Sequence, residues 1–259
     1  MTSRPREPFV DYVDILRGQA TLDSPYAGEL PAIKAIKRLS LHPKVTFFIG
    51  ENGTGKSTLL EAIAVADGFN PEGGTRNFNF SSRDSHADLY KWIRLGRGVR
   101  GMRRSDGFFL RAESFYNVAS EIDRLGFDPA KSPYGSVSYH EQSHGESFIS
   151  LFVDRLRGDG LYLLDEPEAA LSPQRQLAFL VAMHELIERE SQFIIATHSP
   201  IIMAYPEALI YEFSDDGLRT VEYRDTEHYR VTLAFLNHPE RTLQHLFRDE
   251  DEENGDKPD

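Results

Sequence analysis

A glycine-rich run in the first quarter of the chain has the residue types and spacing of a phosphate-binding loop. It fits the pattern G-x-x-x-x-G-K-[ST] at every fixed position, and its residues are Gly50, Glu51, Asn52, Gly53, Thr54, Gly55, Lys56 and Ser57. In such a loop successive backbone N–H groups turn inward to hold an anion, and glycines permit the positive φ angles that this requires. We expect Lys56 to reach the β- and γ-phosphates and Ser57 to bind Mg²⁺. The run therefore predicts binding of a nucleoside triphosphate.

The flanking residues supply the structural context that this loop needs. Residues 45–49 form a short apolar run with high strand propensity, and residues 58–66 have the pattern of a helix. The N-terminus of that helix adds a positive dipole beside the phosphates, so we count Thr58, its first residue, among the nucleotide-binding residues. The alternative to a phosphate-binding loop is a chance glycine-rich turn. The order strand, loop and helix disfavours this alternative.

Two carboxylates follow a second apolar run, at residues 161–164. A strand over these residues would bring Asp165 to the edge of a sheet, where it could hold Mg²⁺ directly or through water. Glu166, one residue further, could polarise the attacking water as a general base. The alternative is a strand followed by a turn with two solvated acids, which the phosphate-binding loop elsewhere in the chain disfavours.

A third apolar run, at residues 194–196, ends in Thr197 and His198. An imidazole at the end of a strand could donate a hydrogen bond to the γ-phosphate and sense its hydrolysis. A lone histidine is more often structural, but this one is expected at the same sheet edge as Asp165. We therefore predict a functional role for His198.

The apolar pattern alternates between strands and helices, which is typical of an α/β fold with a mainly parallel sheet. Strands are predicted at residues 32–41, 45–49, 108–111, 161–164, 193–196, 209–213 and 219–223. Helices are predicted at residues 58–66, 114–125, 146–156, 174–190 and 227–236. In parallel sheets ligands bind at the carboxyl ends of the strands, and all three motifs fall there.

Composition indicates a globular chain and is compatible with a reducing compartment. Of its 259 residues 40% are hydrophobic and 27% charged, and none is cysteine, which excludes disulfides and thiolate chemistry. The polar N-terminus has no apolar signal core, and no stretch approaches the roughly 20 apolar residues needed to span a bilayer. We expect a cytoplasmic protein with an irregular arm at residues 1–31, one domain at residues 32–248 and a disordered acidic tail at residues 249–259.

Charge is distributed unevenly along the chain, whose net charge is −12. The tail contributes seven acids and one lysine, a net of −6. Residues 91–104 carry six basic side chains and no acid, and we refer to them as the basic patch. The patch could bind the phosphates of DNA, chiefly through residues 94–104. The alternatives are a solvated arginine face or a loop near the nucleotide.

The three motifs together resemble those of an ABC-type ATPase domain. The resemblance implies a P-loop NTPase fold: a mainly parallel sheet flanked by helices, with a small antiparallel or helical subdomain. The family's Leu-Ser-Gly-Gly-Gln signature, which binds the γ-phosphate of the opposite subunit, is matched at residues 142–146 by Ser143 and Gly145. Glu146 replaces the glutamine, as in the chromosome-maintenance and repair branch, while Gln142 and His144 depart from the pattern. The family's distal loop resembles residues 168–171.

One part of the family pattern is missing. Members usually have a glutamine between the phosphate-binding loop and the signature that contacts Mg²⁺ and water, and this chain has none between Ser57 and Glu141. Glu113 is our candidate replacement, with a purely structural role as the alternative. The chain is similar to the small stand-alone bacterial ATPases related to AAA-labelled, overcoming-lysogenization-defect-like and repair ATPases.

The resemblance implies that two subunits join around ATP, each giving its signature to the site of the other, and that Glu166, His198 and Lys56 carry hydrolysis. Three purposes are then open: DNA maintenance or phage defence, the nucleotide-binding subunit of a membrane transporter, or an ATP-driven switch for a protein partner. For stacking on adenine, Tyr12, Tyr26 and Arg38 are equal candidates.

Overall fold

The computed structural model describes residues 6–16, 30–74, 88–102, 104–111 and 156–247. The chain divides into two compact units, Met1–Val221 and Glu222–Asp259, which we describe separately. Within the described residues, no helix is long and apolar enough to cross a membrane.

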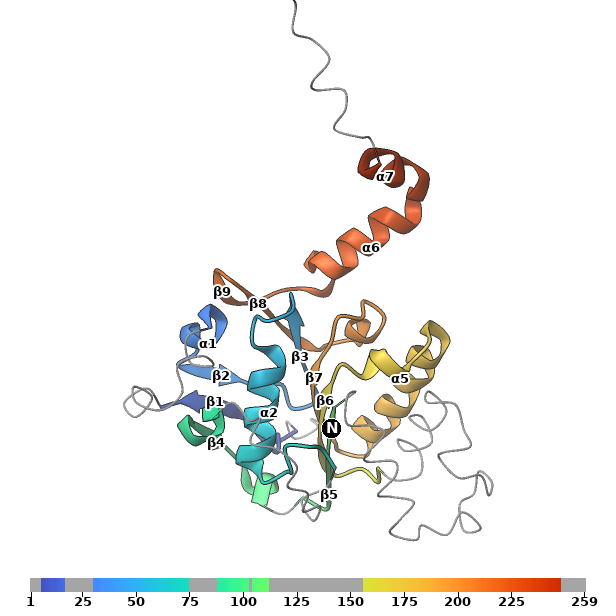
Figure 1. Cartoon of the computed structure of the whole chain (residues 1–259). Coiled ribbons are helices and arrows are strands. Elements are labelled where there is room, and N and C mark those ends of the chain that lie inside the picture. Colours follow the sequence, from blue (N-terminus) through green and yellow to red (C-terminus); the bar gives the residue numbers. More distant parts are fainter. Residues whose placement is uncertain (1–5, 17–29, 75–87, 103, 112–155, 248–259) are drawn as a thin grey trace, which may run out of the picture. The chain divides into compact units, whose positions relative to one another are not determined.

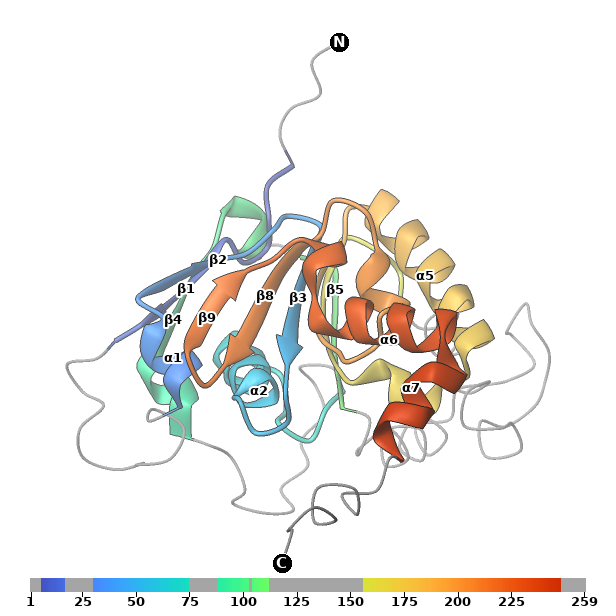
Figure 2. The same cartoon turned by 90° about the horizontal axis from the view of Figure 1, so that it is seen from above.

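A six-stranded sheet forms the centre of the first unit (Figure 2). Its spatial order is β5 (Asp106–Arg111), β6 (Gly160–Asp165), β7 (Gln192–Ala196), β3 (Val45–Gly50), β8 (Leu209–Ser214) and β9 (Gly217–Thr220). All neighbours pair in parallel except β9, which returns antiparallel to β8 through a tight turn. Because β3, β6 and β7 run parallel side by side, their carboxyl ends meet at one edge of the sheet.

Helices cover both faces of this sheet. Helix α2 (Lys56–Asp67) lies on one face and α5 (Pro173–Glu188) on the other (Figure 1). Every residue of β3, β6 and β7 is buried, as expected for strands covered on both sides. Ser172 caps α5 by accepting a hydrogen bond from the Arg175 amide, and Pro173 occupies its first turn, which confirms the predicted start of this helix.

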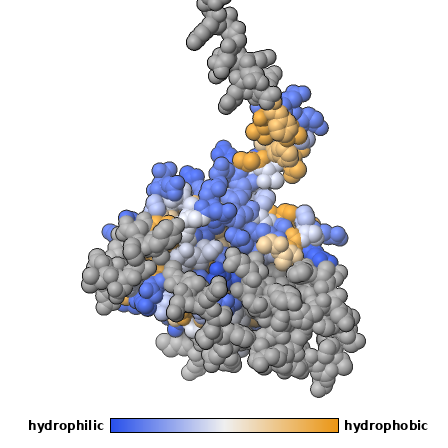
Figure 3. Space-filling model, viewed as in Figure 1, coloured by the Kyte–Doolittle hydropathy of each residue, from blue (hydrophilic) through white to orange (hydrophobic). Residues whose placement is uncertain are grey.

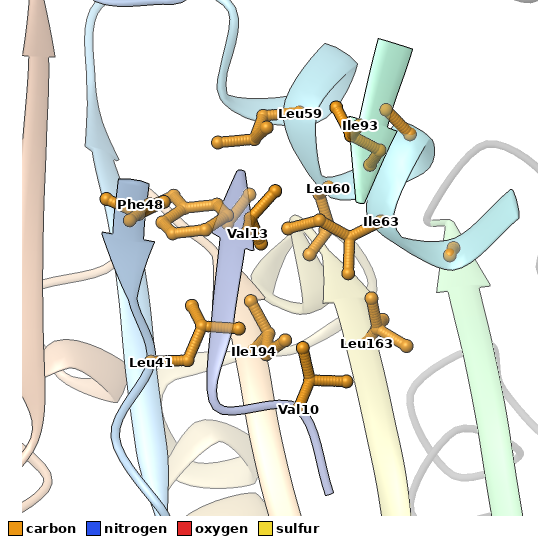
Figure 4. Close-up of a cluster of buried hydrophobic side chains, with 14 of the residues drawn as sticks. Val10, Val13, Leu41, Phe48, Leu59, Leu60, Ile63, Ile93, Leu163 and Ile194 are labelled. Atoms are coloured by element: carbon orange, nitrogen blue, oxygen red, sulfur yellow. The ribbon is translucent and has the colours of Figure 1, made fainter. Parts of the chain in front are cut away.

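A second, smaller sheet packs on the α2 side. Its strand order is β2 (Arg38–Ser40), β1 (Tyr12–Ile15) and β4 (Ile93–Gly96), all antiparallel, and the short helix α1 (Pro31–Ala35) lies between β1 and β2 in sequence. Val13 and Ile93 of this sheet enclose a hydrophobic core with Leu60 of α2 and with Leu163 and Ile194 of the central sheet (Figure 4). The small sheet thus clamps α2, and with it the loop from which α2 starts, against the central strands.

The structure confirms the predicted fold class: a mainly parallel sheet flanked by helices, with a small antiparallel sheet. The predicted strand at residues 32–41 is wrong, because this segment contains α1 followed by β2. The buried positions explain the difference, since Ala32, Ile33 and Ile36 have helical spacing whereas Leu39 and Leu41 alternate as in a strand. The predicted strand at residues 219–223 starts and ends earlier, at β9, because the chain reverses at Gly217, whose φ is 123°.

Two strands, β1 and β4, were not predicted at all. They are four residues long, and β1 lies in the arm that we expected to be irregular. The helices predicted at residues 114–125 and 146–156 lie outside the described residues, apart from Leu156.

The second unit contains helix α6 (Glu227–Asn237), which confirms the helix predicted at residues 227–236, and helix α7 (Pro239–Leu246). Thr226 caps α6 by accepting a hydrogen bond from the Tyr229 amide at 3.2 Å. Apolar side chains gather on the surface of these two helices (Figure 3), among them Val231, Leu236 and Leu246.

Candidate functional site

The phosphate-binding loop connects the end of β3 to the start of α2. Its first residue, Gly50, has a φ of 130°, and a Cβ atom there would lie 2.1 Å from the Phe213 carbonyl oxygen of β8. Gly53 and Gly55 also have positive φ angles, of 83° and 104°. Only glycine takes these conformations without strain, so the loop depends on all three. Thr54 closes the turn by donating its hydroxyl to the Glu51 carbonyl at 2.8 Å.

Lys56 is buried and folds back over the loop that precedes it. Its ammonium nitrogen donates hydrogen bonds to the carbonyl oxygens of Gly50 and Glu51, each at 2.7 Å. Burial lowers the pKa of Lys56, while the nearby carboxylates of Glu166 and Asp165 oppose that shift. Among the described residues, the hydrogen bonds of this ammonium go to carbonyl oxygens, so a bound anion would add a charged acceptor and the loop suits a phosphate group.

Ser57 and Asp165 bring the phosphate-binding loop and the end of β6 together. The Ser57 hydroxyl donates a hydrogen bond to the Asp165 carboxylate at 2.8 Å, across 108 positions of sequence. Magnesium prefers oxygen ligands and is usually bound through one or two side chains together with substrate phosphates. The hydroxyl–carboxylate pair at the mouth of an anion-binding loop fits that requirement.

Glu166 and His198 face each other at the ends of β6 and β7. The His198 Nε2 atom lies 3.7 Å from a carboxylate oxygen of Glu166, and both side chains are partly exposed. Glu166 has a φ of 50°, and its amide donates to the Ala196 carbonyl at 2.9 Å. A non-glycine residue held in this left-handed region stores strain, which is typical of functional sites.

The residues predicted for the site fall into two groups. One group meets at the carboxyl edge of β3, β6 and β7, and it consists of the phosphate-binding loop together with Asp165, Glu166 and His198. Thr58 lies half-buried in the first turn of α2. Glu113, Ser143 and Gly145 lie outside the described residues. Their roles, and those of all the predicted site residues, stay predictions.

The sequence did not single out Glu168 as a site residue, although it noted the loop that contains it. Glu168 lies in a 3₁₀ helix, Pro167–Ala170, and its carboxylate accepts hydrogen bonds from the Thr197 hydroxyl and the His198 amide. Its only sequence signal is a third acid shortly after Asp165 and Glu166, which a solvated loop would also produce. That Glu168 binds the loop carrying Thr197 and His198 can be seen only in the folded chain.

The two stacking candidates that the structure describes contact each other. The Arg38 guanidinium lies 3.7 Å from the centre of the Tyr12 ring, on the small sheet. Tyr26 lies outside the described residues. The choice between them as adenine contacts stays open.

Most side chains of the basic patch form ion pairs within the chain. Lys91 contacts Asp88, Arg94 contacts Asp14, and Arg100 contacts Asp159 and Glu190. Arg97 and Arg104 both contact Asp67, at the end of α2, and Arg97 does so at 2.7 Å. The positive charge of the patch is therefore largely balanced by acids of the same chain, of which all but Asp88 are distant in sequence. Arg94 pairs within the small sheet, whereas Arg97, Arg100 and Arg104 join the segment after β4 to other parts of the first unit.

Replacing Asp67 with alanine is expected to lower the free energy of unfolding by about 3–5 kcal/mol, the usual cost of removing one partner of a buried ion pair. The Asp67 and Arg104 side chains are only 1% and 6% exposed, so water cannot replace the lost carboxylate. Urea denaturation followed by circular dichroism measures the effect. The control is Asp88→Ala, which removes the more exposed pair with Lys91 and should cost less than about 1 kcal/mol. Equal effects of the two substitutions would contradict a buried ion pair at Asp67.

Comparison with protein-family models gives two matches. Residues 34–101 match a family described as an AAA domain, and residues 133–204 match an AAA domain family whose description includes "AbiEii toxin, Type IV TA system". The first match contains the phosphate-binding loop, and the second contains Asp165, Glu166 and His198.

Comparison with curated proteins gives relatives among ABC exporters. The pyoverdine export ATP-binding/permease protein PvdT of Pseudomonas entomophila is 23% identical over 232 residues, which are 78% of this chain and 33% of that protein. The macrolide export ATP-binding/permease protein MacB of Burkholderia lata is 26% identical over 218 residues, which are 76% of this chain and 30% of that protein. The chain therefore spans about a third of the length of these curated relatives.

Among solved structures, the SMC head domain from Thermotoga maritima is 14% identical, with a TM-score of 0.46 and coverage of 82% of this chain and 99% of that chain. The fold, the phosphate-binding loop and the two AAA domain matches support a small ATPase of the ABC/AAA type. The chain has an ATP-binding fold.

Proposed function

We propose that this chain binds and hydrolyses ATP with Mg²⁺, converting ATP and water to ADP and phosphate. One observation carries the proposal: the phosphate-binding loop, the Asp165–Glu166 pair and His198 converge at one sheet edge. The Ser57–Asp165 hydrogen bond of 2.8 Å and the Glu166–His198 approach of 3.7 Å link the three motifs into a single site. A loop, a metal-binding pair and a carboxylate base are the parts that phosphoryl transfer to water needs.

Each of these residues has a distinct proposed role. Backbone N–H groups of residues 50–57 hold the phosphates, and Lys56 exchanges its carbonyl partners for β- and γ-phosphate oxygens. Ser57 and Asp165 would hold Mg²⁺, which neutralises phosphate charge when bound. Glu166 accepts a proton from the attacking water, and His198 donates a hydrogen bond to the γ-phosphate.

We further propose that ATP joins two copies of the chain in a two-fold arrangement, with Ser143 and Gly145 of each copy at the phosphates of the other. Glu113 is proposed to complete the Mg²⁺ site. Hydrolysis then separates the two copies. The support for this step is the resemblance of residues 142–146 to the ABC signature.

For the biological setting we propose DNA maintenance or phage defence, in the cytoplasm. The description of the family matched by residues 133–204, which names a toxin of a TA system, favours defence, and Glu146 favours the repair branch. The proposal does not depend on the basic patch at residues 94–104, because its described arginines contact acids of the same chain. The second candidate is a nucleotide-binding subunit of a transporter, which the names of the two exporters support.

The test is ATP turnover by the purified chain, with and without Mg²⁺ and with and without double-stranded DNA. We expect turnover that EDTA abolishes, and a rise of several-fold with DNA if the setting is DNA maintenance or defence. Turnover that depends on Mg²⁺ but is unchanged by DNA would support the proposed ATPase activity and favour a protein or membrane partner. Nucleotide binding without any turnover would overturn the proposed hydrolysis.

A further inference from the structure

The loop that follows the Asp165–Glu166 pair is joined to the loop that carries His198 through one partly buried acid, Glu168. Glu168 lies two residues after Glu166, in the 3₁₀ helix Pro167–Ala170. Its side chain crosses from the end of β6 to the end of β7. A carboxylate taken out of water is costly unless hydrogen bonds compensate for the loss, so its partners decide what it does there.

Both carboxylate oxygens of Glu168 are used on the same neighbouring loop. One accepts the Thr197 hydroxyl at 2.8 Å, and the other accepts the backbone amide of His198 at 2.5 Å. Hydrogen bonds to an ionised acceptor are short and about twice as strong as neutral ones. Two such bonds to adjacent residues fix the direction in which the chain leaves β7. They therefore fix the backbone position from which the His198 side chain extends.

A second bridge braces the same two loops a few residues further on. The Ser199 hydroxyl donates to the Gln176 side-chain oxygen at 2.5 Å, and the Gln176 side-chain nitrogen donates to the Leu171 carbonyl at 3.1 Å. The Ser199 amide also donates to the Thr197 hydroxyl oxygen at 3.0 Å. Gln176, Thr197 and Ser199 are buried, so the two loops are held as one unit rather than by exposed contacts.

The environment of Glu168 shows that this arrangement has a cost. Burial raises the pKa of the Glu168 carboxyl, and the hydrogen bonds from His198 and Thr197 oppose that rise. The charge of Glu166 works in the same direction as burial. An apolar residue would avoid this cost but could not hold the His198 amide. The Glu168 carboxylate therefore holds the His198 loop in place at a cost in desolvation.

We propose that Glu168 is a positioning residue that ties the His198 loop to the Glu166 loop and so keeps the general base and the histidine directed at the same phosphate. The inference rests on the proposed ATP hydrolysis. In the described contacts Glu168 touches neither Lys56 nor Ser57, so its loss should slow the chemical step without weakening ATP binding. Its effect is thereby distinguishable from that of the phosphate-binding loop.

The test compares Glu168→Ala, Glu168→Gln and wild type in single-turnover ATP hydrolysis, with ATP affinity measured by equilibrium binding. Removing an outer-shell partner typically costs about 10- to 100-fold, so we expect this fall in rate for Glu168→Ala, with ATP affinity changed less than about threefold. Glu168→Gln keeps one acceptor oxygen and should lie between Glu168→Ala and wild type. The control is Glu185→Ala, an exposed acid on α5, which should leave both quantities unchanged.

The partner residue keeps the inference falsifiable if Glu168→Ala fails to fold. Thr197→Val removes the hydroxyl and should slow hydrolysis about tenfold, whereas Thr197→Ser keeps the hydroxyl and should restore most of the rate. A rate within twofold of wild type for a folded Glu168→Ala, or equal rates for the two Thr197 variants, would overturn the positioning role. Wild-type protein that binds ATP without hydrolysing it would overturn the proposed function on which the inference rests.

Discussion

Glu166→Gln is expected to reduce ATP turnover by about 10²- to 10⁴-fold, the usual contribution of a general base, while ATP affinity is retained. Glutamine has the same shape as glutamate, so the backbone at residue 166, whose φ is 50°, can keep its conformation. The amide cannot accept a proton from water, however. Multiple-turnover kinetics and equilibrium ATP binding, measured on the same preparation, separate the two effects.

The same variant tests the proposed ATP-joined dimer. Because hydrolysis is blocked, Glu166→Gln with saturating ATP and Mg²⁺ should accumulate as a dimer in light scattering, whereas the sample without nucleotide should not. Glu188→Gln, an exposed site on α5, is the matched control and should behave as wild type. A Glu166→Gln chain that stays monomeric with bound ATP would argue against the dimer, and one that hydrolyses ATP normally would argue against Glu166 as the base.

The elements that carry the site were predictable because their sequence signals are local. Strands β3, β6 and β7 are buried on both faces, so they appear as unbroken apolar runs, and each run stops at the motif it presents. Glycines with positive φ are likewise recognisable, because no other residue type suits the loop. The convergence of Lys56, Asp165 and His198 then follows from parallel strands sharing one carboxyl edge.

The small sheet was not predictable for the opposite reason. Strand β1 pairs with β2 and β4, so its partners are 24 to 28 and 78 to 84 positions away. Four residues with one buried acid give no periodic signal. That acid, Asp14, accepts hydrogen bonds from Arg38 and Arg94, which hold its pKa below the usual range. The sequence left a nucleic-acid surface open for the basic patch because most of the acids that balance it come from other parts of the chain.

Glu168 shows the same limit within the site itself. Its position after Asp165 and Glu166 was visible, but its partners lie 29 and 30 positions further along the chain. Residue type and spacing identify side chains that contact a ligand at the carboxyl edge of a parallel sheet. They do not identify side chains that position other site residues, because those contacts depend on how two loops pack against each other.

Lys56→Ala is expected to weaken ATP binding by at least about 100-fold, because the variant loses a charge-assisted contact to two phosphates in a buried site. The loss can be followed as thermal stabilisation by ligand. ATP at 100 times its dissociation constant should stabilise wild type by about 2.7 kcal/mol, and the same concentration should stabilise Lys56→Ala by less than about 0.5 kcal/mol. Lys44→Ala, which removes a more exposed lysine that contacts Glu207, is the control and should keep the full shift.

Protonation gives this prediction a second, independent readout. Burial lowers the pKa of Lys56 in the nucleotide-free chain, and only the charged ammonium attracts phosphate. As the pH rises through that lowered pKa, ATP affinity of the wild type should fall, since a proton must then be taken up on binding. Lys56→Ala has no such group and should show a flatter profile over the same range. Equal pH profiles for the two proteins, or a full ligand shift in Lys56→Ala, would mean that the loop holds phosphate through its backbone N–H groups alone.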